Sequence, residues 1–378
     1  MTHPVIPWAK PTLWGAEKDY VQRAVESSWI SGGPFVDELE KRLRELLHVP
    51  YAVAVANGTA AIHLAYLALN VQPGDEIIVP GFGFQAAANI ALHMQARPVF
   101  AEVDPDTWCL TAEGVEACLS PRTVAIVPVH TYGNVCGMDE INDLARRHEL
   151  AVIEDAAESF GSSYHGESAG CMGTMGCFSF QATKTITTGE GGLVVTRDAA
   201  LHDRMLSYRS HGMLKKRYWH DVPGHNFRLT NMQAAFGCAQ LDHLTDITIQ
   251  RDRLFQRYWS RLQNQVGIVL QHFPSAVKPL LWAVACRLDP TVFPQGRDAV
   301  IQELLRAAIE TRPGFYAASM QPIYETRPLP ICEAIGSQVI SLPTFPDLTD
   351  GEVDFICNKL LAFGVKQKSV AEVHGRAA

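Results

Sequence analysis

Helical spacing of apolar residues is clearest in the N-terminal part of the chain. In FVDELEKRLRELLHV, the apolar side chains of Phe35, Leu39, Leu43 and Leu46 recur on one face, and the charged residues fall on the other. Apolar residues three or four positions apart form one stripe along a helix. The spacing therefore predicts an amphipathic helix that packs against a core.

Beyond this helix, short apolar runs alternate with helical runs. The expected strands are YAVAVAN, DEIIVP, PVFAEVD, TVAIVPVH and LAVIEDA, with CFSF and GGLVVT further along the chain. Continuously apolar strands separated by helices are typical of a mainly parallel sheet that is covered on both faces. The sequence thus predicts an α/β fold whose functional groups collect at the ends of the strands.

The pattern changes near residue 241. A long polar helix is expected over residues 241–263, and mixed short strands and helices follow it. We predict a large domain over residues 1–240, which includes the N-terminal segment, and a bridging helix with a smaller C-terminal α/β domain over residues 241–378. The residues after Val365 are expected to form a frayed tail.

Composition and charge narrow the classes of function. The 378 residues include 32 basic and 40 acidic side chains, a net charge of −8, and no basic run. This balance argues against nucleic acid or an anionic membrane as the main partner and favours a small-molecule ligand. We find no apolar segment typical of a signal peptide or a membrane span, so a cytoplasmic protein is expected. Nine scattered cysteines without a CxxC pair favour reduced core thiols over disulfides or a metal site.

Two residues near the ends of expected strands carry candidate chemistry. Asp155 ends LAVIEDA, where a carboxylate must face solvent, cap a turn or meet a cation. One such cation is the protonated pyridine nitrogen of pyridoxal phosphate. Lys184 lies in SFQATKTITTGEGG, among hydroxyls and glycines that allow close approach of backbone to a ligand, and its amine can form a Schiff base with an aldehyde. The structural alternatives are a turn cap and an exposed lysine.

The turn NGTAA, between an expected strand and helix, offers a third element. The backbone N–H groups of Gly58 and Thr59 at the start of the helix suit a phosphate. Such a turn is common by itself, but together with Asp155 and Lys184 it completes the groups that pyridoxal phosphate needs. Phe84, at the start of the next helix, could stack on the pyridine ring or belong to the core.

Seven ordered blocks resemble the DegT/StrS-type nucleotide-sugar aminotransferases. The blocks are GPFVDELE, NGTAAIHLA, PGDEIIVP, VHTYGN, IEDAAESFGSSYHG, SFQATKTITTGEGG and GHNFRLTNMQAA. They cover nearly the whole chain. The resemblance implies the aspartate-aminotransferase-like fold of fold type I pyridoxal phosphate enzymes. KTITTGEGG, RYWHDVPGHNFR and IETRPGFY look most like the perosamine-synthase branch of the family.

The resemblance implies a role for each matching residue. Lys184 would carry pyridoxal phosphate covalently, and Asp155 would hold the pyridine nitrogen, which makes these two the catalytic candidates. Glu158 would contact the ring hydroxyl. The other implied cofactor-binding residues are Gly58, Thr59 and Ser179 at the phosphate, Phe84 on the ring, and Asn226, which would reach the phosphate site of a neighbouring subunit.

The resemblance also implies partners and substrates. It predicts an obligate homodimer with shared active sites, an amino-acid donor such as L-glutamate, and a nucleotide-linked keto-deoxysugar as acceptor. In the perosamine branch this acceptor is GDP-4-keto-6-deoxymannose. No metal is implied.

Three positions depart from the family pattern, and two other functions stay open. Asn57 replaces the usual Ser, Gln181 replaces an aromatic residue or His, and Ser319 replaces a His near the sugar site. A dehydratase of the same fold would carry His in place of Lys184, and a non-catalytic binding protein could keep the fold without activity. A dinucleotide-dependent oxidoreductase is excluded because no GxGxxG joins the first strand to its helix.

Overall fold

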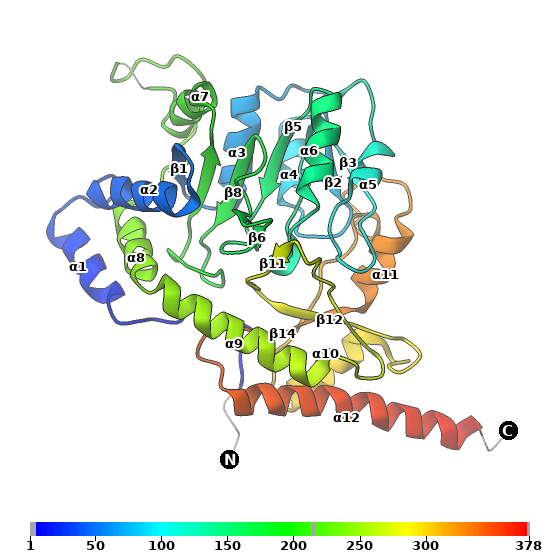
Figure 1. Cartoon of the computed structure of the whole chain (residues 1–378). Coiled ribbons are helices and arrows are strands. Elements are labelled where there is room, and N and C mark those ends of the chain that lie inside the picture. The colour runs from blue at the N-terminus through cyan, green and yellow to red at the C-terminus, as the bar shows by residue number, and fades with distance from the viewer. Residues whose placement is uncertain (1–4, 214–215, 376–378) are drawn as a thin grey trace.

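A computed structural model describes residues 5–213 and 216–375 of the chain (Figure 1). Helices cover the sheets and link them. They are α1 (Glu17–Glu26), α2 (Pro34–Leu47), α3 (Gly58–Leu69), α4 (Ala86–His93), α5 (Ala112–Glu116), α6 (Met138–Arg147), α7 (Ala199–Arg209), α8 (Asn231–Asp242), α9 (Leu244–Leu262), α10 (Gly296–Arg306), α11 (Pro330–Gln338) and α12 (Asp350–Gly375).

The central element is a seven-stranded sheet with the order β1-β9-β8-β5-β4-β2-β3. Its strands are β1 (Tyr51–Val55), β2 (Glu76–Pro80), β3 (Arg97–Ala101), β4 (Thr123–Ile126), β5 (Ala151–Asp155), β8 (Met175–Ser179) and β9 (Gly192–Thr196). Only β9 runs against its neighbours, so the carboxyl ends of β1, β5 and β8 lie at one edge. Every residue of β2, β8 and β9 is buried, as expected of strands covered on both faces.

Two smaller sheets complete the fold. A four-stranded sheet has the order β10-β12-β14-β13, and a three-stranded sheet has the order β11-β6-β7. Their strands are β6 (Ser163–Tyr164), β7 (Glu167–Ser168), β10 (Ile268–Leu270), β11 (Val277–Lys278), β12 (Val284–Leu288), β13 (Arg312–Pro313) and β14 (Val339–Leu342). Near the N-terminus, Ile6 pairs with Ile309, which brings the first described residues next to the four-stranded sheet.

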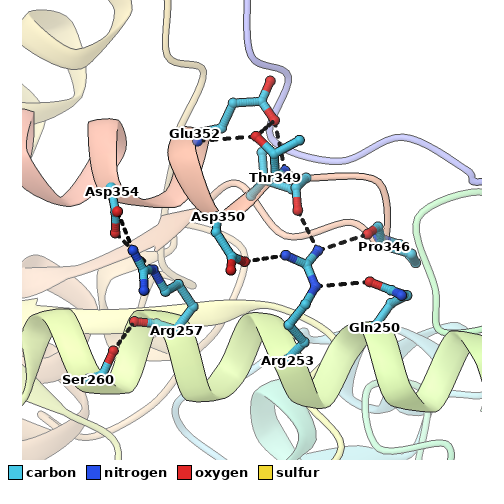
Figure 2. A network of polar contacts seen from close by, with 10 residues as sticks. Gln250, Arg253, Arg257, Ser260, Pro346, Thr349, Asp350, Glu352 and Asp354 are labelled. Atoms are coloured by element: carbon cyan, nitrogen blue, oxygen red, sulfur yellow. Dashed lines mark hydrogen bonds and ion pairs between the residues drawn. The ribbon is translucent and has the colours of Figure 1, made fainter.

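Helix α9 leads from the large sheet to the four-stranded sheet and lies beside α12 (Figure 1). Polar contacts join the two helices, as Figure 2 shows. Arg253 of α9 donates to the carbonyl of Leu348 at 2.6 Å and pairs with Asp350, and one turn further along Arg257 pairs with Asp354. These contacts supplement an apolar core that α9 and α12 share with the four-stranded sheet.

The α/β fold with a mainly parallel sheet is confirmed, including the two strands expected in CFSF and GGLVVT. Two boundaries differ from prediction. The long helix expected over 241–263 begins after a break at His243, because α8 ends at Asp242. The tail expected after Val365 is helical to Gly375, where the chain contains no Pro or Gly that would end a helix earlier. The domain division at residue 241 stays a prediction.

All nine cysteines are free thiols, and eight of them are buried. Among the helices that the structure describes, none combines the length and the apolar character needed to cross a bilayer. In the described part of the chain, no three His, Cys, Asp or Glu side chains gather as a metal site would require.

Candidate active site

A pocket of about 810 Å³ opens at the carboxyl ends of β1, β5 and β8. Asp155 is the last residue of β5, Ser179 is the last residue of β8, and α3 starts at Gly58 shortly after β1. Because strands that run in the same direction end at the same edge, the sheet brings these three residues together from distant parts of the chain. The pocket is large enough for a cofactor and part of a substrate.

One end of the pocket is shaped to hold an anion. Asn57 has an extended backbone, and its Oδ1 accepts a hydrogen bond from Ala60 N at 2.8 Å, so it caps α3. Gly58 and Thr59 are the first residues of α3, where backbone N–H groups have no partner within the helix. A Cβ on Gly58 would lie 2.9 Å from the Cβ of Ser179, so only glycine leaves this space open. The arrangement suits a phosphate group.

Two buried carboxyl groups form the floor. Asp155 is 4% exposed, and within the described residues its carboxyl accepts one hydrogen bond, to Oδ1 from Ala157 N at 3.1 Å. Glu158 is 3% exposed, and its Oε2 accepts a hydrogen bond from Tyr132 N at 2.8 Å. Burial raises the pKa of Asp155 above its usual value and raises the pKa of Glu158 to about 7, although the nearby amine of Lys184 opposes both shifts. The floor therefore favours a cationic group placed against it.

Lys184 projects into the same pocket from the turn after β8. Its backbone N–H donates to the carbonyl of Gln181 at 2.8 Å, and the Gln181 side chain accepts from Thr183 N at 2.9 Å. Burial lowers the pKa of Lys184, while Glu158 and Asp155 pull it in the opposite direction. An amine with a lowered pKa is more often neutral, and the neutral amine is the form that attacks a carbonyl or takes up a proton.

An aromatic wall faces the floor. The Lys184 Nζ lies 3.7 Å from the centre of the Trp282 ring, and the Trp282 indole N–H donates to the carbonyl of Thr183 at 3.0 Å. Tyr132 stacks between Trp282 and Phe315, with ring centres 6.3 Å and 5.1 Å away. The wall thus holds the lysine side chain and the turn that carries it.

Tyr132 links this wall to the floor. Its φ of 59° lies in the left-handed region, which costs a residue with a side chain roughly 1 kcal/mol or more. The strained backbone lets its N–H donate to Glu158, while its Oη accepts from Phe315 N at 3.3 Å. Strain that persists beside a pocket is typical of functional sites.

The structure brings most of the residues predicted from the sequence to this pocket. They are Gly58, Thr59, Phe84, Asp155, Glu158, Ser179 and Lys184. Phe84 is 58% exposed and meets Phe315 edge-on. Asn226 is absent from the pocket lining of its own chain; it is exposed, and its Oδ1 accepts from Arg228 Nε at 3.0 Å. Their individual roles stay predictions.

Sequence reasoning missed several lining residues, among them Tyr132, Trp282, Arg312 and Phe315. Tyr132, Arg312 and Phe315 lie in blocks that carry the family resemblance, but nothing in the sequence marked Trp282, which sits in an apolar run. Of the departures from the family pattern, Gln181 lines the pocket and Ser319 does not; the Ser319 hydroxyl donates to Glu333 at 2.6 Å.

These residues fit pyridoxal phosphate. Gly58 leaves room for the phosphate at the start of a helix. The buried Asp155 carboxyl can pair with a cationic ring nitrogen. An enclosed amine lies between the carboxyl groups and an aromatic wall. The lining thus provides partners for the phosphate, the ring and the aldehyde of this cofactor.

Comparison with known proteins identifies similar sequences over nearly the whole chain. Residues 12–361 match the DegT/DnrJ/EryC1/StrS aminotransferase family. The chain is 40% identical to a GDP-perosamine synthase of Escherichia coli O157:H7, with 95% of this chain and 98% of the relative covered. It is 41% identical to a GDP-perosamine synthase of Caulobacter vibrioides, with 93% and 96% covered.

Solved structures show the same likeness in three dimensions. The putative sugar aminotransferase Spr1654 from Streptococcus pneumoniae, in its PLP form, superposes with a TM-score of 0.90 at 26% identity. The superposition covers 96% of this chain and 99% of that one.

Proposed function

The chain belongs to the DegT/DnrJ/EryC1/StrS aminotransferase family, and from this premise we propose that it transfers the amino group of L-glutamate to GDP-4-keto-6-deoxymannose. The products would be 2-oxoglutarate and GDP-perosamine, so an amine and a ketone exchange places. The choice of acceptor is supported by the two relatives named GDP-perosamine synthase, each about 40% identical over most of its length.

The observation that carries the proposal is the position of Lys184. Its amine lies in a pocket with two buried carboxyl groups and an anion cup, and burial lowers its pKa. Pyridoxal phosphate is the cofactor; when bound, it supplies an aldehyde that takes up the amino group and a ring that withdraws electrons. A lowered pKa increases the fraction of neutral amine, which is the form that attacks a carbonyl.

The residues of the pocket would hold the cofactor and transfer protons. The N–H groups of Gly58 and Thr59, with Ser179, would hold the phosphate, and the Asp155 carboxylate would keep the ring nitrogen protonated. Nζ of Lys184 would take the proton from the α-carbon of the donor and later return a proton to the carbon that becomes aminated. Glu158 would accept a hydrogen bond from the ring hydroxyl. Its hydrogen bond from Tyr132 N would also hold Tyr132 in its place in the aromatic wall.

A homodimer with shared sites is part of the proposal. Asn226 is exposed and lies outside the pocket of its own chain, and Arg228 fixes its side-chain oxygen. These features support a role of Asn226 in the site of a second copy. A cytoplasmic location is proposed with it. Sedimentation of the purified protein should give the mass of at least two chains, and a monomer at the concentrations used for assays would contradict this part.

The acceptor is tested by a panel of keto sugars. The enzyme is first converted to its pyridoxamine form with glutamate and is then mixed with GDP-, dTDP- and UDP-linked 4-keto-6-deoxy sugars. Return of the pyridoxal absorbance should be fastest with GDP-4-keto-6-deoxymannose. Turnover of a dTDP- or UDP-linked sugar alone would contradict the GDP-perosamine assignment and leave the aminotransferase assignment standing.

The same preparation separates the two alternatives. A dehydratase would remove a hydroxyl group from the sugar and form no amino sugar, whereas an aminotransferase forms one amino sugar for each 2-oxoglutarate. A non-catalytic binding protein would give neither product.

A further inference from the structure

Arg312 faces the pocket from β13, at the edge of the four-stranded sheet. Its Cζ lies 4.3 Å from the centre of the Trp8 ring, and its side chain is 55% exposed. The nearest carboxylate oxygen belongs to Glu310, 3.6 Å away, which is an ion pair without a hydrogen bond. Among the described residues no acceptor takes a hydrogen bond from the Arg312 guanidinium, so its N–H donors are free for a ligand.

A second arginine close to Lys184, Arg251, is buried and has N–H groups occupied by hydrogen bonds. Arg251 is buried, and its N–H groups donate to the carbonyls of Leu281, Trp282 and Lys184 at 3.0–3.3 Å. These bonds fix the turn under the lysine and leave little for a substrate. Of the residues that line the pocket in the described part of the chain, only Lys184 and Arg312 are basic.

The acidic residues of the pocket lining create a need for a positive charge that can bind an anionic substrate. Asp155, Glu158 and Glu190 are the acidic residues of the lining, and negative charge on any of them would repel an incoming dicarboxylate such as glutamate. Lys184 must be neutral while it reacts, so it cannot offset this repulsion at that moment. Arg312 is the other basic residue of the lining and can supply the positive charge.

We propose that Arg312 binds a carboxylate of the amino-acid donor. The inference rests on the proposed function and names the residue that selects the donor. A planar guanidinium offers two parallel N–H groups to a carboxylate, and the Trp8 ring supports the guanidinium while its edge stays free.

The position of Arg312 favours the donor over the diphosphate of the nucleotide sugar. Trp8 packs edge-on against Trp282 at 5.5 Å, and Trp282 contacts the amine of Lys184, so a continuous aromatic surface joins the two basic groups. In an amino acid, the amine and a carboxylate are bonded to one carbon. In the nucleotide sugar, part of the hexose ring separates the reacting carbon from the diphosphate.

The test compares R312Q and R312K with R306Q, an exposed arginine of α10 outside the pocket lining, in the pyridoxal phosphate-loaded enzyme. Binding of glutarate, a dicarboxylate without an amine, to each variant is measured by tryptophan fluorescence and by calorimetry. Binding of GDP is measured in the same way. We expect R312Q to raise the Kd of glutarate and the KM of glutamate roughly 10- to 100-fold. R312K, which keeps the charge but loses the fork, should give a smaller loss. GDP binding and R306Q should stay within about twofold of the wild type.

Unchanged glutarate binding in R312Q, or a wild type that binds no glutarate, would overturn the inference. A larger loss for GDP than for glutarate would also overturn it, because Arg312 would then serve the diphosphate. If R312Q does not fold, R312K decides by the same criteria. Failure of the proposed acceptor has a different signature: the wild type would form 2-oxoglutarate from glutamate and aminate no GDP-linked keto sugar.

Discussion

The floor and the aromatic wall of the pocket are built in different ways. The floor consists of residues at strand ends of the large sheet, such as Asp155 and Ser179, and of the helix start at Gly58. Apart from Tyr132, the wall comes from residues that follow α9 in the sequence: Trp282 and Phe315 lie next to strands of the four-stranded sheet, and Arg312 lies beside them in β13. The floor holds two buried carboxyl groups and the space at the start of α3, whereas the wall contacts Lys184 and lines the rest of the pocket.

The two regions also differ in exposure and in charge state, which predicts different effects of substitution. The floor residues are enclosed, and their pKa values are displaced by burial. Arg312 on the wall is half exposed and has no hydrogen-bond partner in the described structure. We therefore expect floor substitutions to lower kcat and wall substitutions to change affinity for substrates.

The largest expected effect is at Lys184, whose amine lies against the floor. Lys184→Ala should lower transamination by at least about 1000-fold, because it removes the group that moves the proton and attaches the cofactor. The folded state and the proposed dimer should persist. The matched control is Lys278→Ala, an exposed lysine on β11 outside the pocket, which should leave kcat unchanged. Ordinary turnover by Lys184→Ala would refute the assigned role.

The second substitution weakens the floor without removing its shape. Asp155→Asn can keep the hydrogen bond from Ala157 N but loses the charge that holds a protonated ring nitrogen. Loss of a charge-assisted pair of about 1.5–3 kcal/mol corresponds to a fall in kcat of about 10- to 100-fold. Steady-state rates with saturating glutamate measure it, and a near-normal kcat would mean that another group protonates the ring.

On the wall, the Arg312 substitutions should affect KM for glutamate more than kcat. A variant whose kcat falls while its KM stays constant would erase the distinction between the two regions.

The pH dependence of stability reports on Glu158 in the cofactor-free protein. Burial raises its folded pKa from 4.5 to about 7, so the folded state binds more protons than the unfolded state between these values. The stability contributed by this group is complete below pH 4.5 and is lost as the pH rises through 7. Unfolding free energy should fall by up to about 3 kcal/mol between pH 5 and 7.5.

Glu158→Gln isolates this contribution. The variant should show a flatter pH profile over the same range in urea unfolding, while Glu45→Gln, an exposed control on α2, should follow the wild type. Asp155 also has a raised pKa and contributes in the same direction, so part of the slope should remain. Identical slopes for Glu158→Gln and wild type would refute the burial argument.

The smallest effect is expected away from both regions. Arg253→Met removes the contacts of α9 with the start of α12 and with the carbonyl of Leu348 (Figure 2). Because the site is partly exposed, the loss of unfolding free energy should be about 1 kcal/mol, with kcat and KM unchanged. A clear fall in kcat would show that this contact supports the pocket from a distance.

The floor was accessible from the sequence because its residues follow recognisable local patterns. An apolar run that ends in Asp155, a turn with Gly58 before a helix, and a lysine among glycines each predict a position at one sheet edge. The α/β architecture followed from the same alternation of strands and helices.

The wall could not be predicted in the same way. Trp282 lies in LLWAVACRL, where an aromatic residue is indistinguishable from core, and Arg312 belongs to a strand of two residues. Their approach to Lys184 depends on how the four-stranded sheet packs beside the large one, and this long-range packing leaves no local signal. The break at His243 is of the same kind, since the helical pattern runs through it.

The most direct test of the central claim is borohydride reduction of the pyridoxal phosphate-loaded enzyme followed by peptide mapping. Reduction converts the lysine–cofactor linkage into a stable fluorescent adduct. We predict about one adduct per chain, on the peptide that contains Lys184, and none in Lys184→Ala. An adduct on a different lysine, or a wild type that gives no adduct after saturation with pyridoxal phosphate, would contradict the account.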